Sequence, residues 1–105
     1  MNTEEFVKSF HTEKQEFLKE YLSENPKTEV GRLIQSLNLT DEQNGIMEKI
    51  MNGMLTDVFY TILLGLDGCA SIGGIQEMYD LKDKNGTQLS GEIEEYAYEY
   101  FHESD

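Results

Sequence analysis

The chain has 105 residues, of which 38% are hydrophobic, and this is enough for one domain with a modest core. Its 21 acidic residues outnumber 8 basic ones and give a net charge of −13, which opposes binding to nucleic acid or to an anionic membrane. A single cysteine, Cys69, excludes an internal disulfide and suits a reducing compartment. We therefore expect a single domain over residues 1–105, located in the cytoplasm.

Two further features agree with a cytoplasmic protein. Residues 1–10 are polar and lack the basic-then-apolar order of an export signal. The longest nearly unbroken apolar run, Val58–Leu66, is about half as long as a membrane span. We expect no association with a membrane.

The first predicted helix runs from a Thr3 cap to about Glu24, where Asn25-Pro26 ends it. Apolar residues at helical spacing form its inner stripe, namely Phe6, Phe10, Phe17, Leu18, Tyr21 and Leu22. Lys14 lies in the middle of this stripe. Its side chain either extends out to solvent or marks the point where the stripe meets another subunit.

The second predicted helix is capped by Asn25, has Pro26 in its first position and stops at Asn38. Its predicted inner face consists of Val30, Leu33, Ile34 and Leu37. The third begins with a capping box, Thr40 to Gln43, and reaches about Leu64, with Gly65 as its stop. Apolar residues cover more than half of its circumference, which is typical of a central helix packed on several sides.

A glycine-rich loop, Gly65–Gly74, follows the long helix, and after it the apolar period changes to two. Met78–Lys82 and Thr87–Leu89 are predicted to be short strands of a β-hairpin. A three-residue turn places Leu81 opposite Leu89, with Asp83 starting the turn and Gly86 in the left-handed region. A final helix opens at Ser90 or Gly91 and turns Ile93, Tyr96, Ala97, Tyr100 and Phe101 inward.

The segment Leu81–Glu92 partly matches a calcium-binding EF-hand loop, but the match fails at two essential positions. Leu81 occupies the first ligand position and Gln88 the packing position, and two lysines lie inside the loop. Gly68–Gly73 likewise has the glycine spacing of a phosphate-binding loop, but Gly74 replaces the lysine. Neither segment predicts a ligand site, and two isolated histidines predict no zinc site.

Together these elements predict an α+β fold that is predominantly helical. A long central helix is packed by two N-terminal helices, a β-hairpin and an acidic C-terminal helix. We expect no cofactor and no metal.

The C-terminal helix carries the strongest functional signal. Residues 53–105 hold eleven acidic residues against Lys82 and Lys84 only. On an ideal helix, glutamates form one ridge beside the apolar face, although like charges four residues apart repel. The predicted partner-binding residues are Glu92, Glu95, Tyr96, Glu99, Tyr100, Phe101 and Glu103.

Three functional interpretations follow. The first is a non-catalytic, cytoplasmic protein-binding module, such as an acidic inhibitor or immunity-type protein that neutralises a basic protein. The second is a small enzyme or ligand-binding domain that uses the Gly65–Gly74 loop, with a cleft formed by Asp57, Asp67 and Cys69. Asp57 is expected on a packed side of the long helix, where a hydrogen-bond donor must satisfy it.

The third interpretation is a self-associating structural module. Methionines at spacings of four and three adapt to irregular surfaces, and an aromatic stripe can meet a second subunit. The candidate residues are Met47, Met51 and Met54, or Phe6, Phe10 and Phe17. The preferred interpretation remains the binding of a basic partner.

Overall fold

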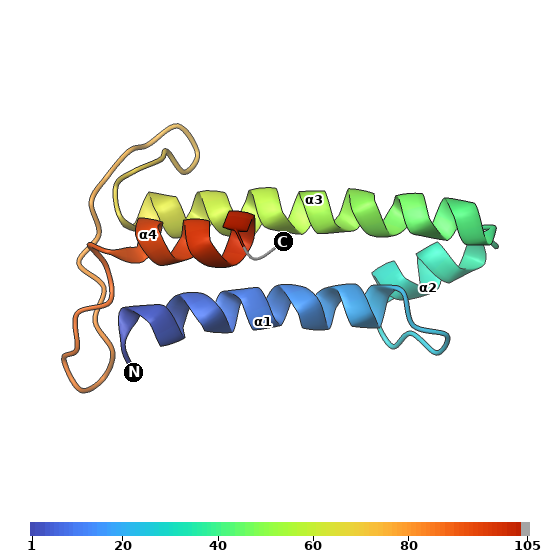
Figure 1. The fold of residues 1–105 in the computed structure, drawn as a ribbon, viewed down its shortest axis with the longest axis horizontal. Helices are drawn as coiled ribbons and strands as arrows, with labels where there is room; N and C mark the ends of the chain where they lie inside the picture. The colour runs from blue at the N-terminus through green and yellow to red at the C-terminus, as the bar shows by residue number, and fades with distance from the viewer. Residues whose placement is uncertain (104–105) are drawn as a thin grey trace.

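A computed structural model describes residues 1–103 and consists of helices joined by one long irregular segment (Figure 1). The helices are α1 (Thr3–Tyr21), α2 (Glu29–Ser36), α3 (Asp41–Leu66) and α4 (Ile93–Tyr98), and a π-helical turn, η1 (Glu99–Glu103), continues α4. Helices α1 and α3 run alongside each other, and α4 packs at one end of the pair while α2 lies at the other. The fold is therefore predominantly helical, as predicted.

Helix α4 begins at Ile93, later than the predicted start at Ser90 or Gly91, and the capping residues of α1 and α2 also differ from prediction. Asn2, not Thr3, caps α1 in a capping box with Glu5. Thr28, not Asn25, caps α2, so this helix starts at Glu29, after Pro26 rather than at it. In both helices the capping residue is the one whose side chain accepts a hydrogen bond from the N–H group three residues later in the chain.

The long helix begins as predicted and ends later than predicted. Thr40 and Gln43 form the predicted capping box at its start. Gly65 lies inside the helix, which continues to Leu66. The glycine in the left-handed conformation is Gly68, with φ 74°, so this glycine rather than Gly65 closes the helix end.

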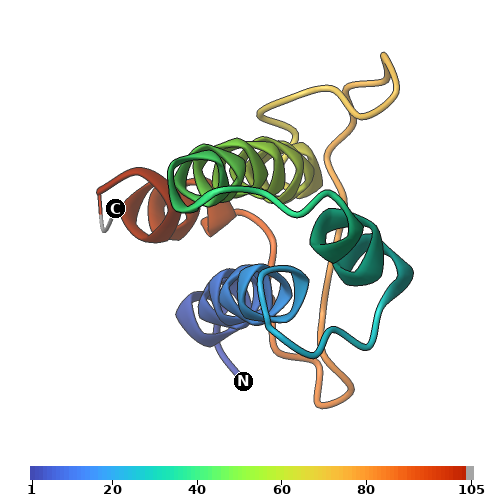
Figure 2. The same ribbon diagram turned by 90° about the vertical axis from the view of Figure 1, so that its right-hand side faces the viewer.

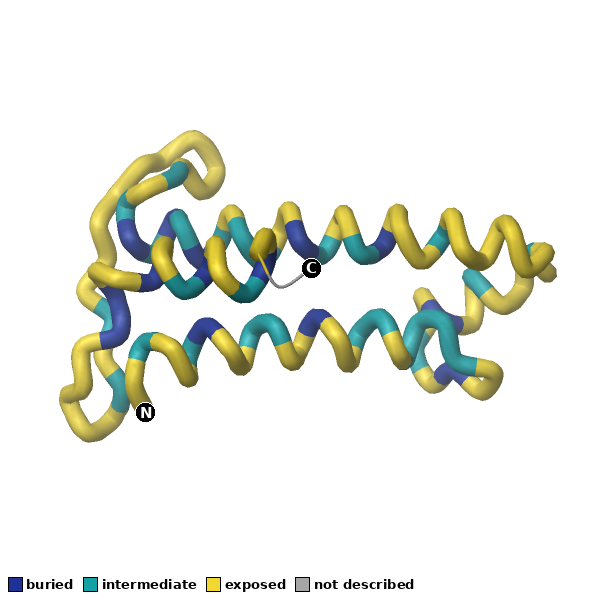
Figure 3. Tube along the Cα trace, in the orientation of Figure 1, coloured by how far each residue is buried: buried dark blue, intermediate teal, exposed yellow. Residues whose placement is uncertain are grey.

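The buried core lies where α1, the second half of α3 and α4 meet. Its members are Val7, Leu63, Ile93, Ala97 and Phe101. Figure 3 shows the buried positions of α3 and α4 gathered at this end, whereas most of α2 and of the first half of α3 is exposed. The core therefore occupies one half of an elongated molecule.

Lys14 is completely buried, so both predictions for it, extension to solvent and contact with another subunit, are wrong. Its Nζ atom lies 5.6 Å from the centre of the Phe101 ring, close enough for a cation–π interaction. The end of the chain folds over α1 at this point and covers a position that is open on an isolated helix.

The predicted inner face of α2 is also wrong. Of its four apolar residues only Ile34 is partly buried, while Val30, Leu33 and Leu37 are exposed. Helix α2 makes its close approach to the end of α1 through its other side. Gly31 is buried there, and a Cβ atom on it would lie 2.6 Å from Pro26 Cβ.

Helix α3 is likewise not packed on several sides along its whole length. Four apolar residues at spacings of four are exposed, namely Ile46, Ile50, Met54 and Val58. The neighbours that the prediction assumed are present only around its second half, where α4 packs.

The segment between α3 and α4 forms the predicted turn without the predicted strands. The Leu89 N–H donates to the Leu81 carbonyl at 2.8 Å, and Gly86 has φ 83°, so the three-residue turn has the predicted register. Within residues 1–103, however, pairing is limited to isolated bridges, Ile72 with Ile75 and Lys82 with Gln88. Residues 1–103 therefore contain no β-strand, and the α+β expectation is not confirmed.

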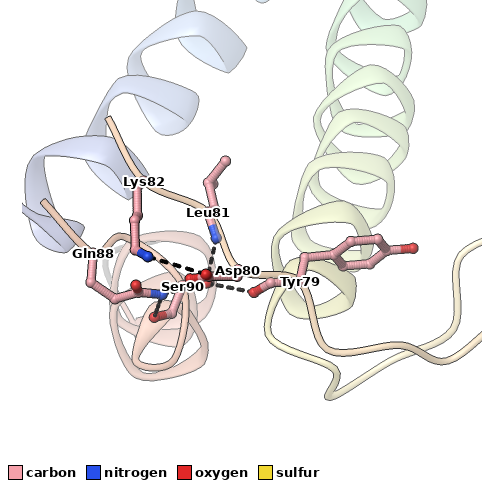
Figure 4. A network of polar contacts seen from close by, with 6 residues as sticks. All are labelled: Tyr79, Asp80, Leu81, Lys82, Gln88 and Ser90. Carbon is pink, nitrogen blue, oxygen red and sulfur yellow. Dashed lines mark hydrogen bonds and ion pairs between the residues drawn. The ribbon is translucent and has the colours of Figure 1, made fainter. Parts of the chain in front are cut away.

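Side chains replace the missing ladder bonds around Ser90 (Figure 4). The Leu81 N–H donates to Ser90 Oγ at 2.9 Å, and Ser90 Oγ donates to the Tyr79 carbonyl at 2.6 Å. The Leu89 carbonyl accepts from Thr3 Oγ1 at 3.1 Å. Because these groups are satisfied in other ways, the second Leu81–Leu89 bond of a ladder is absent.

The molecule is elongated, with extents of 47 × 28 × 25 Å and a radius of gyration of 16.0 Å. A compact domain of this length has a radius of gyration of about 13 Å. Within residues 1–103, none of the helices has the length and apolar character needed to cross a membrane.

Candidate partner-binding site

A surface hollow lies between the end of α3 and the C-terminal helix, with a volume of about 490 Å³. Its walls carry two aromatic side chains and four carboxylates and no basic side chain. They are Tyr60 from α3, Glu94, Glu95 and Tyr98 from α4, and Glu99 and Glu103 from η1. We call this the acidic hollow.

Asp67 fixes the position of α4 against the end of α3. It is buried, and its carboxylate accepts from the Gly91 N–H at 2.5 Å and from the Glu94 N–H at 2.9 Å. Glu92, the residue before α4, supplies no side-chain cap of its own. A carboxylate from the end of one helix thus caps the next helix, which sets the shape of the hollow.

The aromatic side chains of the acidic hollow are held by His102. Its ring lies edge-on to Tyr60 with centroids 4.4 Å apart, and 5.6 Å from the ring of Tyr98. Tyr98 is 51% exposed, so about half of this residue is accessible from solvent. Burial, followed by the negative charge of Glu94, raises the pKa of Tyr60, which therefore stays a neutral phenol at physiological pH.

The walls of the acidic hollow differ from the ridge predicted on an ideal helix. Glu95, Glu99 and Glu103 line the acidic hollow as part of that ridge, whereas Glu92 does not line it. Glu94, which an ideal helix places on another side, lines it as well. Glu92 precedes α4 and does not have helical backbone angles. The hollow also extends over the side of α4 that carries Glu94 and Tyr98.

The predicted aromatic contacts are mostly on the core side. Phe101 is buried and cannot touch a partner, so its prediction as a contact is wrong. Tyr96 and Tyr100 are partly buried against the core, and the Tyr100 hydroxyl donates to Glu4 Oε2 at 2.9 Å. The sequence analysis did not identify Tyr60 or Tyr98 as lining residues. The spacing of four between Glu94 and Tyr98 indicates that these two side chains share one face of the helix.

Most glutamates of the C-terminal helix have no basic side chain paired with them in the described part of the chain. Within residues 1–103, no lysine or arginine forms an ion pair with Glu92, Glu95 or Glu103. Glu99 has an interaction partner and is left out of this charge argument. The ion pairs that form elsewhere join the N-terminal amine to Asp83 and Lys82 to Asp80.

Cys69 lies beside the acidic hollow as a protonated thiol. Its Sγ–H donates to Glu94 Oε2 at 3.1 Å. This hydrogen bond to a carboxylate, together with partial desolvation, raises the pKa of Cys69 to about 11. Such a thiol is a poor nucleophile at neutral pH.

The structure does not bring together the three residues of the predicted cleft. Asp57 is exposed rather than packed, because the side of α3 that carries it has no neighbour. It precedes Asp67 by ten residues, about 15 Å along the helix axis. Asp67 is occupied by the α4 amides, and Cys69 contacts Glu94 and the Asp67 carbonyl.

The residues predicted for self-association have mixed positions. Met51 is buried, Met47 is partly buried and Met54 is exposed. The aromatic residues of α1 are all partly buried: Phe6 and Phe10 pack on the core, and Phe17 stacks with Tyr21 and Phe59.

In the part of the chain that the structure describes, no group of three or more His, Cys, Asp or Glu side chains is placed to hold a metal ion. Comparison of this chain with protein-family models, with curated proteins and with solved structures gave no match.

Proposed function

We propose that this protein is a non-catalytic, cytoplasmic protein-binding module that holds a basic protein partner at the acidic hollow. The single observation that carries the proposal is the composition of its walls: Glu94, Glu95 and Glu103 lie beside two tyrosines, and no lysine or arginine of residues 1–103 lines the hollow. The partner supplies the missing cation.

A lysine or arginine side chain suits this site for two reasons. Carboxylates form charge-assisted hydrogen bonds with an ammonium or a guanidinium group. The face of an aromatic ring attracts the same cations, and the half-exposed Tyr98 lines the acidic hollow together with Glu94 and Glu95. A long cationic side chain can therefore use both kinds of contact at once.

The charge distribution supports capture of a basic partner over a distance. Residues 53–105 hold eleven acidic residues and two lysines, so the half of the chain that contains the acidic hollow is strongly negative. Complementary charge raises association rates and is weakened by salt, while a few desolvated anchors hold the complex. An inhibitor or immunity-type protein that neutralises a cationic protein works in this way.

The test is affinity capture from native lysate with matched charge-reversal variants. The site variant is the double substitution Glu95→Lys/Glu103→Lys. The control is Glu13→Lys/Glu16→Lys, which changes the net charge equally at exposed positions of α1. We expect the wild type and the control to retain the same basic protein and the site variant to lose it.

Two outcomes would contradict the proposal. If the site variant and the control lose the partner equally, the attraction depends on net charge and not on the acidic hollow. If both retain it, the partner binds elsewhere. Circular dichroism checks that each variant keeps its helices.

A further inference from the structure

A largely apolar surface, interrupted by the exposed Asp57, lies on the side of the molecule away from the core. We call it the α2–α3 face, and its residues are Val30, Leu33 and Leu37 of α2 and Ile46, Ile50, Met54 and Val58 of α3. Each of these side chains is at least 45% exposed, and Leu33 and Met54 reach 60% and 61%. Monomeric proteins rarely leave so large an apolar patch in water.

The two helices contribute to one surface rather than to two. Val30 of α2 and Met54 of α3 line the same hollow of about 240 Å³, whose other walls are Tyr21, Met51 and Leu55. All five lining residues are apolar or aromatic. A side chain from outside could enter this hollow without losing hydrogen bonds.

The α2–α3 face has a boundary at each end. Helix α2 forms one end, and the loop after α3 forms the other, where Ile72 lies so close that a Cβ atom on Gly65 would be 2.4 Å from its Cγ1. Figure 2 shows α2 and this loop projecting on the same side of α3. The exposed residues of α3 lie between them.

The molecule exposes more surface than a compact monomer of its mass. The accessible surface is 7086 Å², whereas a folded monomer of 12.1 kDa has about 6,000 Å². This surplus is spread over the whole molecule, including the exposed residues 71–80. The seven side chains of the α2–α3 face, each about half exposed, supply several hundred Å² of apolar surface, against the roughly 800 Å² that each partner buries in a stable interface. The molecule is elongated and its core lies in only one half of it, so the α2–α3 face has no neighbour within residues 1–103.

The charge on these helices favours a second copy over the basic partner. Helices α2 and α3 carry five acidic and two basic residues, a small part of the net charge of −13. A basic protein is drawn to the C-terminal half instead. Two copies that meet through the α2–α3 face therefore repel each other less than two copies that meet through their C-terminal halves.

The spacing of the exposed residues also suits self-packing. Ile46, Ile50, Met54 and Val58 form a ridge of i, i+4 positions, and two such ridges interlock at a crossing angle of roughly 50°. A two-fold axis that passes between Ile50 and Met54 places Ile46 opposite Val58 of the other copy. From these observations we infer that the protein forms a homodimer through the α2–α3 face.

The first test uses the wild-type protein, by sedimentation equilibrium and thermal unfolding from about 5 µM to about 500 µM. We expect a mass twice 12.1 kDa at the higher concentrations and a midpoint of unfolding that rises with concentration. A mass of 12.1 kDa throughout, with a constant midpoint, would overturn the inference.

The second test locates the interface with Leu33→Glu and Met54→Glu. Both side chains are mostly exposed in one copy, so a charge there removes little packing within that copy. Each variant is expected to weaken dimerisation at least about tenfold, because the charge is buried at the interface. Met54→Gln, which keeps the side-chain length and helix propensity, serves as a milder variant if a glutamate disturbs folding.

The matched control is Ser36→Glu, which adds the same charge at an exposed position of α2 outside the face. It is expected to change the dimer affinity less than about twofold. A dimer that survives both glutamate variants would place the interface elsewhere and overturn the inference. A dimer that Ser36→Glu weakens as much would also overturn it, since the effect would then be one of net charge.

Discussion

Asp67 shows how much of the site depends on one buried carboxylate. It accepts hydrogen bonds from two amides of the α4 start and has almost no exposure. Replacement by alanine leaves these N–H groups without a partner, so we expect Asp67→Ala to lower the free energy of unfolding by about 2–3 kcal/mol. Urea denaturation followed by circular dichroism measures this loss.

Glu48→Ala is the matched control, because Glu48 is an exposed carboxylate of the same helix that lies outside the α2–α3 face. It is expected to change the stability by less than about 0.5 kcal/mol. Equal effects of the two substitutions on the free energy of unfolding would show that the hydrogen bonds of Asp67 to the start of α4 do not stabilise the fold.

Cys69 gives a second prediction at this scale. The carboxylate of Glu94 raises the pKa of the thiol to about 11, so few thiolates exist at pH 8. In Glu94→Gln this charge is lost and the pKa falls toward its ordinary value of about 8.5. We expect the reaction of Cys69 with iodoacetamide at pH 8 to become at least about tenfold faster. An unchanged rate would mean that Glu94 does not control the thiol.

Single residues were the hardest to predict from the sequence. The roles of Asp67 and Lys14 depend on neighbours that come from other elements: the amides of α4 for Asp67 and the ring of Phe101 for Lys14. Periodicity within one helix contains no information about such neighbours. Asp57 was misassigned for the converse reason, since the face on which it lies meets no neighbour within the chain.

At the scale of elements, Glu20 joins α1 to α2. Its carboxylate accepts from the Thr28 hydroxyl at 2.7 Å and from the Lys27 N–H, and these hydrogen bonds lower the pKa of Glu20. Thr28 Oγ1 in turn accepts from the Gly31 N–H. Glu20 therefore supports the cap of α2.

The pH dependence of α2 follows from the sign of this shift. A carboxyl whose pKa is lowered by folding stabilises the fold above its unfolded pKa of about 4.3, and this contribution is lost as the pH falls through the lower folded value. We expect the amide of Gly31 to lose protection from hydrogen exchange as the pH is lowered below about 4, and Glu20→Gln to be less protected already at pH 7.

Glu16→Gln is the control for this measurement, because Glu16 is an exposed glutamate of the same helix. It should keep the wild-type protection of α2. If Glu20→Gln also keeps it, the carboxylate does not hold the cap.

Elements defined by local chemistry were predicted well. The four helical regions and the capping box at Thr40 need only neighbours in the sequence, and so does the turn with Gly86. The prediction of two strands was not confirmed, because Ser90 and Thr3 form hydrogen bonds with the backbone groups of Leu81 and Leu89 that a β-ladder would pair. Glu92 and Glu94 were misplaced relative to the acidic hollow, because Glu92 precedes the helix and the hollow extends over the side of α4 that carries Glu94 and Tyr98.

At the scale of the whole molecule, the protein has two different surfaces. The acidic hollow lies at the end of the molecule where α4 packs on α3. The α2–α3 face begins at α2, at the other end, and continues along α3 as far as Val58. The apolar residues of α2 and α3 were recognised in the sequence and assigned to a core, although Met47, Met51 and Met54 were also considered as a surface for self-association. An amphipathic pattern predicts that a face is covered and not whether the same chain covers it.

Salt separates the two surfaces. Between about 50 and about 500 mM NaCl, screening weakens attraction to a basic partner and reduces repulsion between two acidic copies. We therefore expect salt to weaken binding of an oligo-arginine peptide and to strengthen dimerisation, by calorimetry and sedimentation respectively. If both respond in the same direction, one of the two binding modes is wrongly described.

The two proposals can fail independently. A Leu33→Glu monomer should still bind the oligo-arginine peptide, because its acidic hollow is unchanged. Conversely, Glu95→Lys/Glu103→Lys should still form a dimer, because neither residue belongs to the α2–α3 face.

The most direct test of the central claim is a nuclear magnetic resonance titration of the protein with the oligo-arginine peptide. We predict that the largest shifts occur at the acidic hollow, in Tyr60, Glu95, Tyr98 and Glu103, and disappear in Glu95→Lys/Glu103→Lys but not in Glu13→Lys/Glu16→Lys. Small shifts spread evenly over acidic residues of all the helices would contradict it, because the peptide would then respond to net charge alone.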